Sequence, residues 1–133
     1  MKKILFVCTG NSCRSQIAEG LAKNLGYEAY SAGTKPEIEI NPYAIKVMAD
    51  INIDISSQYP KLVEEINIEK IDIIITVCSN ADKNCPVFYG FIGKKIHYSF
   101  DDPAYATGTK KEKLKVFYRV RDEIKNYLIK NPL

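Results

Sequence analysis

Hydrophobic residues along the chain alternate between short continuous runs and longer segments in which they recur every three or four positions. The continuous runs are typical of strands buried on both faces of a parallel sheet, and they occupy 4–8, 27–32, 71–77 and 95–100. The periodic segments predict helices, and they occupy 15–25, 42–51, a short stretch at 62–66, and 114–128. Strands that alternate with helices in this way indicate a parallel α/β sheet with right-handed crossovers.

Turn and capping residues support these boundaries. Gly26 follows the first predicted helix where a left-handed glycine commonly ends one. Asn41-Pro42 has the form of a helix cap followed by a first-turn proline. We therefore predict a single domain over 1–133, built as a doubly wound sheet of about four parallel strands flanked by helices.

The composition is that of a soluble globular protein, since 46% of the 133 residues are hydrophobic and 26% are charged. No apolar run approaches the ~20 residues that a membrane-spanning helix needs. The first apolar run ends at Cys8 and leads into a polar loop instead of a cleavage site, so we expect a cytoplasmic protein. The net charge of +3 is too small to indicate a nucleic-acid partner, and we interpret the lysines between 110 and 115 as a solvated helix face.

The cysteines of the chain are Cys8, Cys13, Cys78 and Cys85. Structural disulfides are rare in cytoplasmic proteins, so we expect thiols at these positions. No Cys-x-x-Cys pair is present and His97 is the only histidine, which argues against a zinc site. We therefore predict no metal site and assign any shared role of the cysteines to thiol chemistry.

The loop between the first predicted strand and the first predicted helix has the composition of an oxyanion site. Gly10 permits unusual backbone dihedrals, Asn11 tolerates left-handed ones, and a helix N-terminus favours negative charge. Arg14 adds a planar guanidinium suited to bidentate contact with oxyanion oxygens. The predicted oxyanion-binding residues are Thr9, Gly10, Asn11, Ser12, Cys13, Arg14 and Ser15.

Cys8 ends the first predicted strand at the start of this loop, and we predict that it is a nucleophile. The field that holds an anion also stabilises a thiolate, and a helix N-terminus lowers a cysteine pKa from ~8.5 to ~3.5–7.5. Ser15 is placed to hydrogen-bond its sulfur. The alternative, a small buried residue that only packs, is the interpretation we favour for Cys13.

The segment Cys-Thr-Gly-Asn-Ser-Cys-Arg-Ser-Gln at 8–16 resembles the signature loop of the low-molecular-weight tyrosine phosphatase superfamily, and more narrowly that of the thioredoxin-coupled arsenate reductases. The resemblance covers nearly the whole chain, through Ala18-Glu19-Gly20, Tyr30-Ser31-Ala32-Gly33, Asn41-Pro42, Ile53-Asp54-Ile55-Ser56, Thr76-Val77-Cys78, Asn84-Cys85-Pro86, Phe100-Asp101-Asp102-Pro103 and Arg119-Val120-Arg121-Asp122-Glu123-Ile124. It implies a low-molecular-weight phosphatase-like fold and arsenate as the substrate, with phosphate or sulfate as competing oxyanions.

Two further cysteines distinguish a reductase from a simple phosphatase, which has no use for a cysteine pair after the third predicted strand. The resemblance implies a relay in which Cys78 attacks Cys8 and Cys85 then attacks Cys78, forming the disulfides Cys8–Cys78 and Cys78–Cys85 in turn. Thioredoxin is the implied reductant of the second. If the first and third strands are neighbours, their ends lie ~4.8 Å apart, which suits the first disulfide. Seven residues of helix would span ~10.5 Å, so the second disulfide requires a folded-back loop and a redox-coupled rearrangement.

Asp102 precedes Pro103, and the resemblance assigns the general acid to an aspartate in that position. It would protonate the oxygen that leaves arsenic or phosphorus. We expect Asp101 to cap or orient the same loop, and the alternative is that both aspartates only form a turn. His97 is interpreted as a strand residue, since a thiolate of lowered pKa needs no base.

Some relatives hold a potassium ion near the first loop with residues that match Asn11, Glu19 and Ser31 and with a further carboxylate. Lys61 stands at the position of that carboxylate here. A lysine replaces the ion with its own charge, so we predict no firm potassium site and no tightly bound cofactor. We expect a monomer without a membrane partner.

These observations leave three functions open. The leading one is an arsenate reductase whose catalytic residues are Cys8, Arg14, Cys78, Cys85 and Asp102. The second is a phosphatase that hydrolyses a phosphate monoester through a phosphocysteine at Cys8. The third is a non-catalytic thiol sensor that binds an oxyanion and signals through its disulfide state. Only the reductase depends on Cys78 and Cys85, which separates it from the phosphatase. The thiol sensor differs from both because it needs no catalytic turnover.

Overall fold

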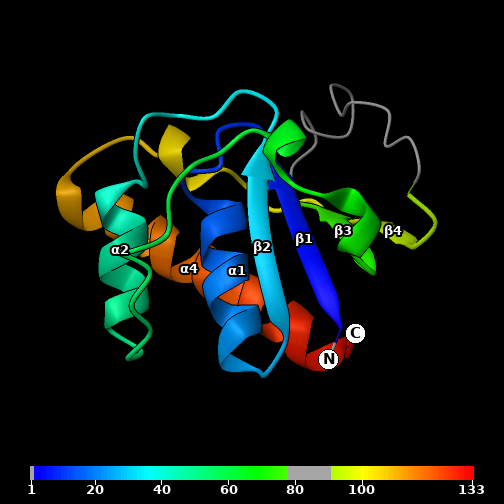
Figure 1. The fold of residues 1–133 in the computed structure, drawn as a ribbon. Helices are drawn as coiled ribbons and strands as arrows, with labels where there is room; N and C mark the ends of the chain where they lie inside the picture. Colours follow the sequence, from blue (N-terminus) through cyan, green and yellow to red (C-terminus); the bar gives the residue numbers. More distant parts are fainter. Residues whose placement is uncertain (1, 78–90) are drawn as a thin grey trace.

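The protein is described by a computed structural model that covers residues 2–77 and 91–133. In this part of the chain a four-stranded parallel sheet forms the centre, with the strand order β2-β1-β3-β4 (Figure 1). The strands are β1 (Lys3–Cys8), β2 (Glu28–Gly33), β3 (Ile73–Thr76) and β4 (Lys94–His97). The prediction of a parallel α/β sheet of about four strands is confirmed.

Helices connect and flank these strands. The α helices of the described residues are α1 (Arg14–Asn24), α2 (Pro42–Ala49) and α4 (Lys110–Lys130). The 3₁₀ turns are η1 (Val63–Glu65), η2 (Ile68–Lys70) and η3 (Pro103–Tyr105). Helix α1 packs against β1, β2 and α4, while α2 packs against α4, and Figure 1 shows α1 running beside β2.

Several elements are shorter than their hydrophobic patterns predict, including β3 and α2. The helix predicted at 62–66 is only the 3₁₀ turn η1, because Ile66 already has an extended backbone with φ −94° and ψ 133°. The strand predicted at 95–100 ends at His97. Beyond it the chain turns so that the carbonyl of Phe100 accepts a hydrogen bond from Arg14.

Two of the continuous apolar runs form the central strands β1 and β3, which are buried on both faces, whereas the edge strand β4 is mostly exposed, contrary to the prediction for 95–100. Residues 4–7 of β1 and 73–75 of β3 are at most 5% exposed. Helix α4 instead buries a single stripe, formed by Phe117, Val120, Ile124 and Leu128. The lysines at its N-terminal end are mostly exposed, which confirms their interpretation as a solvated helix face.

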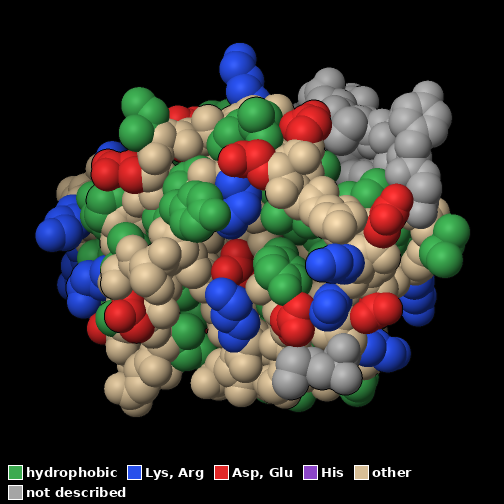
Figure 2. Space-filling view, viewed as in Figure 1, with side chains coloured by type: hydrophobic (Ala, Val, Ile, Leu, Met, Phe, Trp, Pro, Cys, Tyr) green, Lys and Arg blue, Asp and Glu red, His purple; other side chains and the backbone are tan. Residues whose placement is uncertain are grey.

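The surface mixes charges of both signs. On the face shown in Figure 2, lysine and arginine side chains are interspersed with aspartate and glutamate, in keeping with the net charge of +3. Within residues 2–77 and 91–133, every helix is too short or too polar to cross a lipid bilayer.

A glycine determines how closely the loop after β1 approaches β2. Cys8 pairs with Gly33 in the parallel register of the two strands. A Cβ atom on Gly33 would lie 2.5 Å from the carbonyl oxygen of Thr9 and 3.0 Å from Cβ of Asn11. The loop therefore takes its position because Gly33 has no side chain.

Gly33→Ala is expected to push this loop away from β2, because the added methyl group meets backbone atoms rather than a movable side chain. Urea denaturation should show a loss of about 1–3 kcal/mol in the free energy of unfolding, and inorganic phosphate should bind more weakly. Gly26→Ala is the control, since its φ of 96° disfavours alanine while a Cβ there meets nothing within 4 Å. Equal phosphate affinity in the two variants would contradict this role of Gly33.

Candidate active site

The loop between β1 and α1 is held from outside by residues 34–41, which we call the strap. Backbone N–H groups of the strap donate to loop carbonyls at 2.8–3.2 Å, in the pairs Thr34 to Cys8, Lys35 to Thr9, Glu37 to Gly10 and Asn41 to Ser12. The N–H and C=O groups of a trans peptide point in opposite directions, so carbonyls bonded to the strap turn the following N–H groups away from it. One of them, the N–H of Asn11, points at the sulfur of Cys8.

The sulfur of Cys8 receives hydrogen bonds from the loop around it. Cys8 is 2% exposed, and its Sγ lies 2.7 Å from Ser15 Oγ and 3.2 Å from the backbone nitrogen of Asn11. The Asn11 side-chain amide donates to Ser15 Oγ at 2.7 Å, which leaves the Ser15 hydroxyl to donate its own hydrogen to Cys8. Two donors directed at one sulfur favour the thiolate over the thiol.

Arg14 connects this loop to the segment after β4. Its Nη1 donates to the carbonyl of Phe100 and its Nη2 to the carboxylate of Asp102, both at 3.1 Å. Among residues 2–77 and 91–133, none accepts a hydrogen bond from Arg14 Nε, although that atom is buried. A buried N–H group without an acceptor is costly unless a ligand supplies one. Nε is therefore available to an oxygen of a bound anion.

The two aspartates after β4 have different partners. Asp102 pairs with Arg14 through Oδ2, and its Oδ1 accepts the backbone N–H of Ala104 at 3.0 Å, which caps η3. Asp101 pairs with Arg119 of α4 at 3.2 Å. Asp101 thus ties the segment after β4 to helix α4. Asp102 both caps the η3 turn and faces the loop between β1 and α1.

These groups surround one hollow of about 420 Å³ at the carboxyl end of β1. Ser15 is fully buried and reaches Cys8 rather than the hollow, so of the predicted oxyanion-binding residues it alone lies outside the wall. The wall consists of loop, strap and η3 residues: Cys8, Thr9, Gly10, Asn11, Ser12, Cys13, Arg14, Lys35, Pro36, Glu37, Asp102, Ala104 and Tyr105.

Sequence reasoning missed the strap residues Lys35, Pro36 and Glu37 and the η3 residues Ala104 and Tyr105. The strap follows β2 directly, and the carboxyl ends of neighbouring parallel strands meet at one edge of a sheet. The place of residues 34–41 directly after β2 could therefore have indicated that the strap lies beside the loop. Nothing in the residue types themselves indicated a place at the site.

Cys13 is buried in the core and differs from Cys8 in its environment. Burial raises the pKa of the Cys13 thiol to about 12. At neutral pH this thiol is therefore protonated. Cys13 is 3% exposed and Cys8 2%, so the two thiols differ in their hydrogen bonds and not in their exposure. These properties support a packing role for its side chain.

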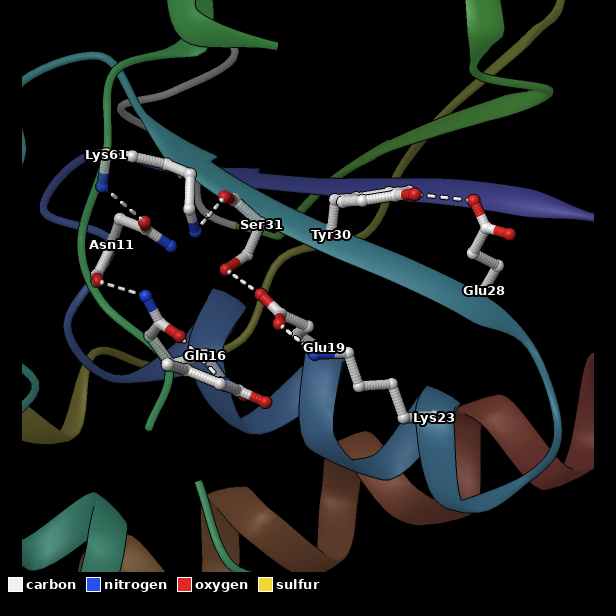
Figure 3. A network of polar contacts seen from close by, with 9 residues as sticks. Asn11, Gln16, Glu19, Lys23, Glu28, Tyr30, Ser31 and Lys61 are labelled. Atoms are coloured by element: carbon white, nitrogen blue, oxygen red, sulfur yellow. Dashed lines mark hydrogen bonds and ion pairs between the residues drawn. The ribbon is translucent and has the colours of Figure 1, made fainter. Parts of the chain in front are cut away.

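A second polar cluster lies behind the loop, between α1 and β2 (Figure 3). Lys61 donates its ammonium group to the Ser31 carbonyl and its backbone N–H to Asn11 Oδ1, both at 3.0 Å. The Ser31 hydroxyl donates to the buried carboxylate of Glu19 at 2.6 Å, and Lys23 pairs with the same carboxylate at 2.6 Å. Burial lowers the pKa of Lys61. The residues matched to potassium ligands are thus gathered here with a lysine ammonium beside them.

Cys78 and Cys85 lie outside the described residues, so their places in the relay stay predictions. The backbone just before Cys78 is described, and there Val77 donates its N–H to the carbonyl of Val7 at 2.9 Å. His97 lies within β4, as expected for a strand residue. In the described part of the chain, no three His, Cys, Asp or Glu side chains gather as ligands for a metal ion.

Comparison with known proteins identifies the relatives of this chain. A model of the low molecular weight phosphotyrosine protein phosphatase family matches residues 3–131. The arsenate reductase of Bacillus subtilis (strain 168) is 46% identical over 130 residues, which cover 96% of this chain and 92% of that protein. The arsenate reductase of Staphylococcus aureus (strain N315) is 44% identical over 127 residues, covering 93% and 91%.

Solved structures show the same fold. An arsenate reductase in the phosphate binding state is 32% identical, has a TM-score of 0.81, and is matched over 98% of this chain and 95% of its own. The low molecular weight protein tyrosine phosphatase of T. tengcongensis is 27% identical, with a TM-score of 0.79 over 98% of this chain and 97% of its own. The sequence, the fold and the loop at Cys8 agree with these relatives, and the chain belongs to the low molecular weight phosphotyrosine protein phosphatase family.

Proposed function

We propose that this chain reduces arsenate to arsenite in the cytoplasm and that its own cysteines supply the two electrons. One observation carries the proposal: a hydrogen-bonded sulfur, at Cys8, and a buried guanidinium N–H without an acceptor among the described residues, at Arg14, border the same hollow. A tetrahedral oxyanion supplies both the missing acceptor and the electrophile. The relatives named arsenate reductase support arsenate as that oxyanion.

In the first step arsenate enters the hollow with its oxygens on the loop N–H groups and on Arg14. The sulfur of Cys8 attacks arsenic, and an oxygen leaves as water after taking a proton from Asp102. A thiol–arsenate adduct results, in which arsenic is still pentavalent. Asp102 pairs with Arg14 at 3.1 Å in the structure, so an anion that binds Arg14 competes for the guanidinium. The freed carboxylate then takes up a proton from solvent or from the incoming hydrogen arsenate, and it passes this proton to the leaving oxygen.

The next steps move two electrons from sulfur to arsenic. Cys78 attacks the sulfur of Cys8, the S–As bond breaks, and its electron pair stays on arsenic, which leaves as arsenite. Cys85 then attacks Cys78, which releases the Cys8 thiolate and forms the Cys78–Cys85 disulfide. Thioredoxin reduces this disulfide to two thiols and restores the enzyme.

The strand arrangement supports the first disulfide. Strands β1 and β3 are direct neighbours, and the N–H of Val77 donates to the carbonyl of Val7. Each of these valines immediately precedes one of the two cysteines, Cys8 and Cys78. Neighbouring strands lie ~4.8 Å apart, which is within the ~4.4–6.8 Å between Cα atoms that a disulfide spans.

We also propose that Lys61 makes a bound potassium ion unnecessary. Glu19 is 5% exposed, and a buried carboxylate requires positive charge nearby. Lys23 pairs with it directly, and the ammonium of Lys61 lies at the carbonyl of Ser31, whose hydroxyl donates to Glu19. The reductase would therefore work without a tightly bound cofactor, with thioredoxin as its electron donor.

A phosphatase that acts through a phosphocysteine at Cys8 is the second candidate. The family model and the structural similarity to a tyrosine phosphatase favour it. It would use the same Cys8, Arg14 and Asp102, so some hydrolysis of phosphate monoesters is expected of either enzyme. Only the reductase needs Cys78 and Cys85.

Iodoacetamide at mildly acidic pH is expected to modify Cys8 before Cys13. Two hydrogen-bond donors stabilise the Cys8 thiolate, whereas burial raises the pKa of Cys13 to about 12 and keeps that thiol protonated until strongly alkaline pH. Peptide mapping measures the modification at each cysteine, and inorganic phosphate is expected to protect Cys8. Modification of Cys13 first would contradict the assignment of the nucleophile.

Cys78→Ser is expected to abolish multiple-turnover arsenate reduction while sparing most hydrolysis of an aryl phosphate, since only the reduction needs a second sulfur. The reduction is followed as NADPH consumption with arsenate, thioredoxin and thioredoxin reductase, in sodium salts because Lys61 removes the need for potassium. Cys85→Ser should stop after one turnover with a Cys8–Cys78 disulfide, detected by non-reducing peptide mapping.

Cys8→Ser is the control that should lose both activities. No NADPH consumption by the unmodified protein with arsenate would overturn the proposed function. A parallel fall of both activities in Cys78→Ser would instead make Cys78 a structural residue and remove the relay.

A further inference from the structure

We infer that Gln16 and Gln58 form a pair of positioning residues that fixes the peptide between Asn11 and Ser12 and so directs one N–H group into the oxyanion site. The inference rests on the oxyanion site proposed above and adds two side chains to it. Neither glutamine lines the hollow, so both act through the loop backbone.

The carbonyl of Asn11 is held differently from those on either side of it. The carbonyls of residues 8, 9, 10 and 12 accept backbone N–H groups of the strap. The carbonyl of Asn11 accepts a side-chain N–H instead, from Gln16 Nε2 at 3.0 Å. Asn11 also has a left-handed backbone, with φ 50°, which persists only where the surroundings support it.

Gln16 is held in turn by Gln58. Gln16 belongs to α1 and is fully buried, and Figure 3 shows its side chain reaching toward Asn11. Gln58 Nε2 donates to Gln16 Oε1 at 2.8 Å and to the Gln16 backbone carbonyl at 3.1 Å. Because Oε1 accepts this hydrogen bond, the amide nitrogen of Gln16 faces Asn11, and the orientation of the amide is determined.

The consequence for the site follows from the planarity of the peptide. The C=O of Asn11 points to Gln16, so the N–H of Ser12 points the opposite way, toward the hollow that Ser12 lines. Rotation of this peptide would replace the N–H with a carbonyl oxygen, which repels both an anion and the Cys8 thiolate. The strap bonds the carbonyls of residues 8, 9, 10 and 12 but not that of Asn11. The hydrogen bond from Gln16 to the Asn11 carbonyl is therefore what opposes rotation of the Asn11–Ser12 peptide.

Gln16→Met keeps the length of the side chain and removes the donor. It is expected to weaken binding of inorganic phosphate about tenfold, as for loss of one hydrogen bond to a charged group, measured by calorimetry. The pH midpoint for alkylation of Cys8 by iodoacetamide should rise. Gln58→Met should change both readouts in the same direction by less, because Gln16 keeps its contact with Asn11 but loses its own support.

The double variant tests whether the glutamines act together. Adding Gln58→Met to Gln16→Met is expected to change neither readout further, because both side chains act through one peptide. Ser57→Ala, at an exposed neighbouring position, is the control and should match the unmodified protein.

Unchanged phosphate affinity and alkylation midpoint in Gln16→Met, with only a lower melting temperature, would overturn the inference and make the pair ordinary core residues. Additive losses in the double variant would also overturn it. If Gln16→Met does not fold, Gln58→Met, at a partly exposed position, provides the test. A raised pH midpoint for Cys8 alkylation would support the inference, and an unchanged midpoint would overturn it. Neither readout involves arsenate, so a protein that binds phosphate but reduces no arsenate would overturn the proposed function and leave this inference standing.

Discussion

The site depends on one constraint, which is that the carbonyls of the loop after β1 are bonded from outside it. Each C=O from Cys8 to Ser12 accepts a hydrogen bond from the strap or from Gln16. The N–H groups are thereby left for the interior of the loop, where they attract an anion and a thiolate alike. In the proposed function, anion binding and activation of Cys8 both follow from this backbone arrangement, so a change that turns one carbonyl inward is expected to weaken both.

The topology of the sheet brings the supporting groups to this loop. The order β2-β1-β3-β4 places the end of β1 between the ends of two neighbours. The strap continues from β2, and the chain that continues from β3 leads to Cys78. Arg14 reaches the segment after β4 and closes the remaining side through Phe100 and Asp102. The proposed oxyanion site and the proposed route for disulfide exchange would therefore share one edge of the sheet.

The parts of this arrangement that are local in sequence could be predicted. Strand β1 and the loop that ends at Arg14 are contiguous, and buried strands need apolar residues throughout, so pattern and spacing were sufficient there. The strap and Gln58 act on the loop through tertiary hydrogen bonds, and their residue types are common in any polar segment. The helix predicted at 62–66 was wrong in extent, because only Val63 of its apolar residues is buried and the backbone is already extended at Ile66.

Reduction of the bound oxyanion by the thiols of the chain itself is tested most directly by a single turnover without thioredoxin. Fully reduced protein is mixed with less than one equivalent of arsenate, arsenite is measured by chromatography with arsenic detection, and thiols are titrated. We expect one arsenite formed and two thiols lost for each arsenate consumed. Recovery of arsenate unchanged with all thiols intact, in protein that still binds phosphate, would contradict the proposed chemistry.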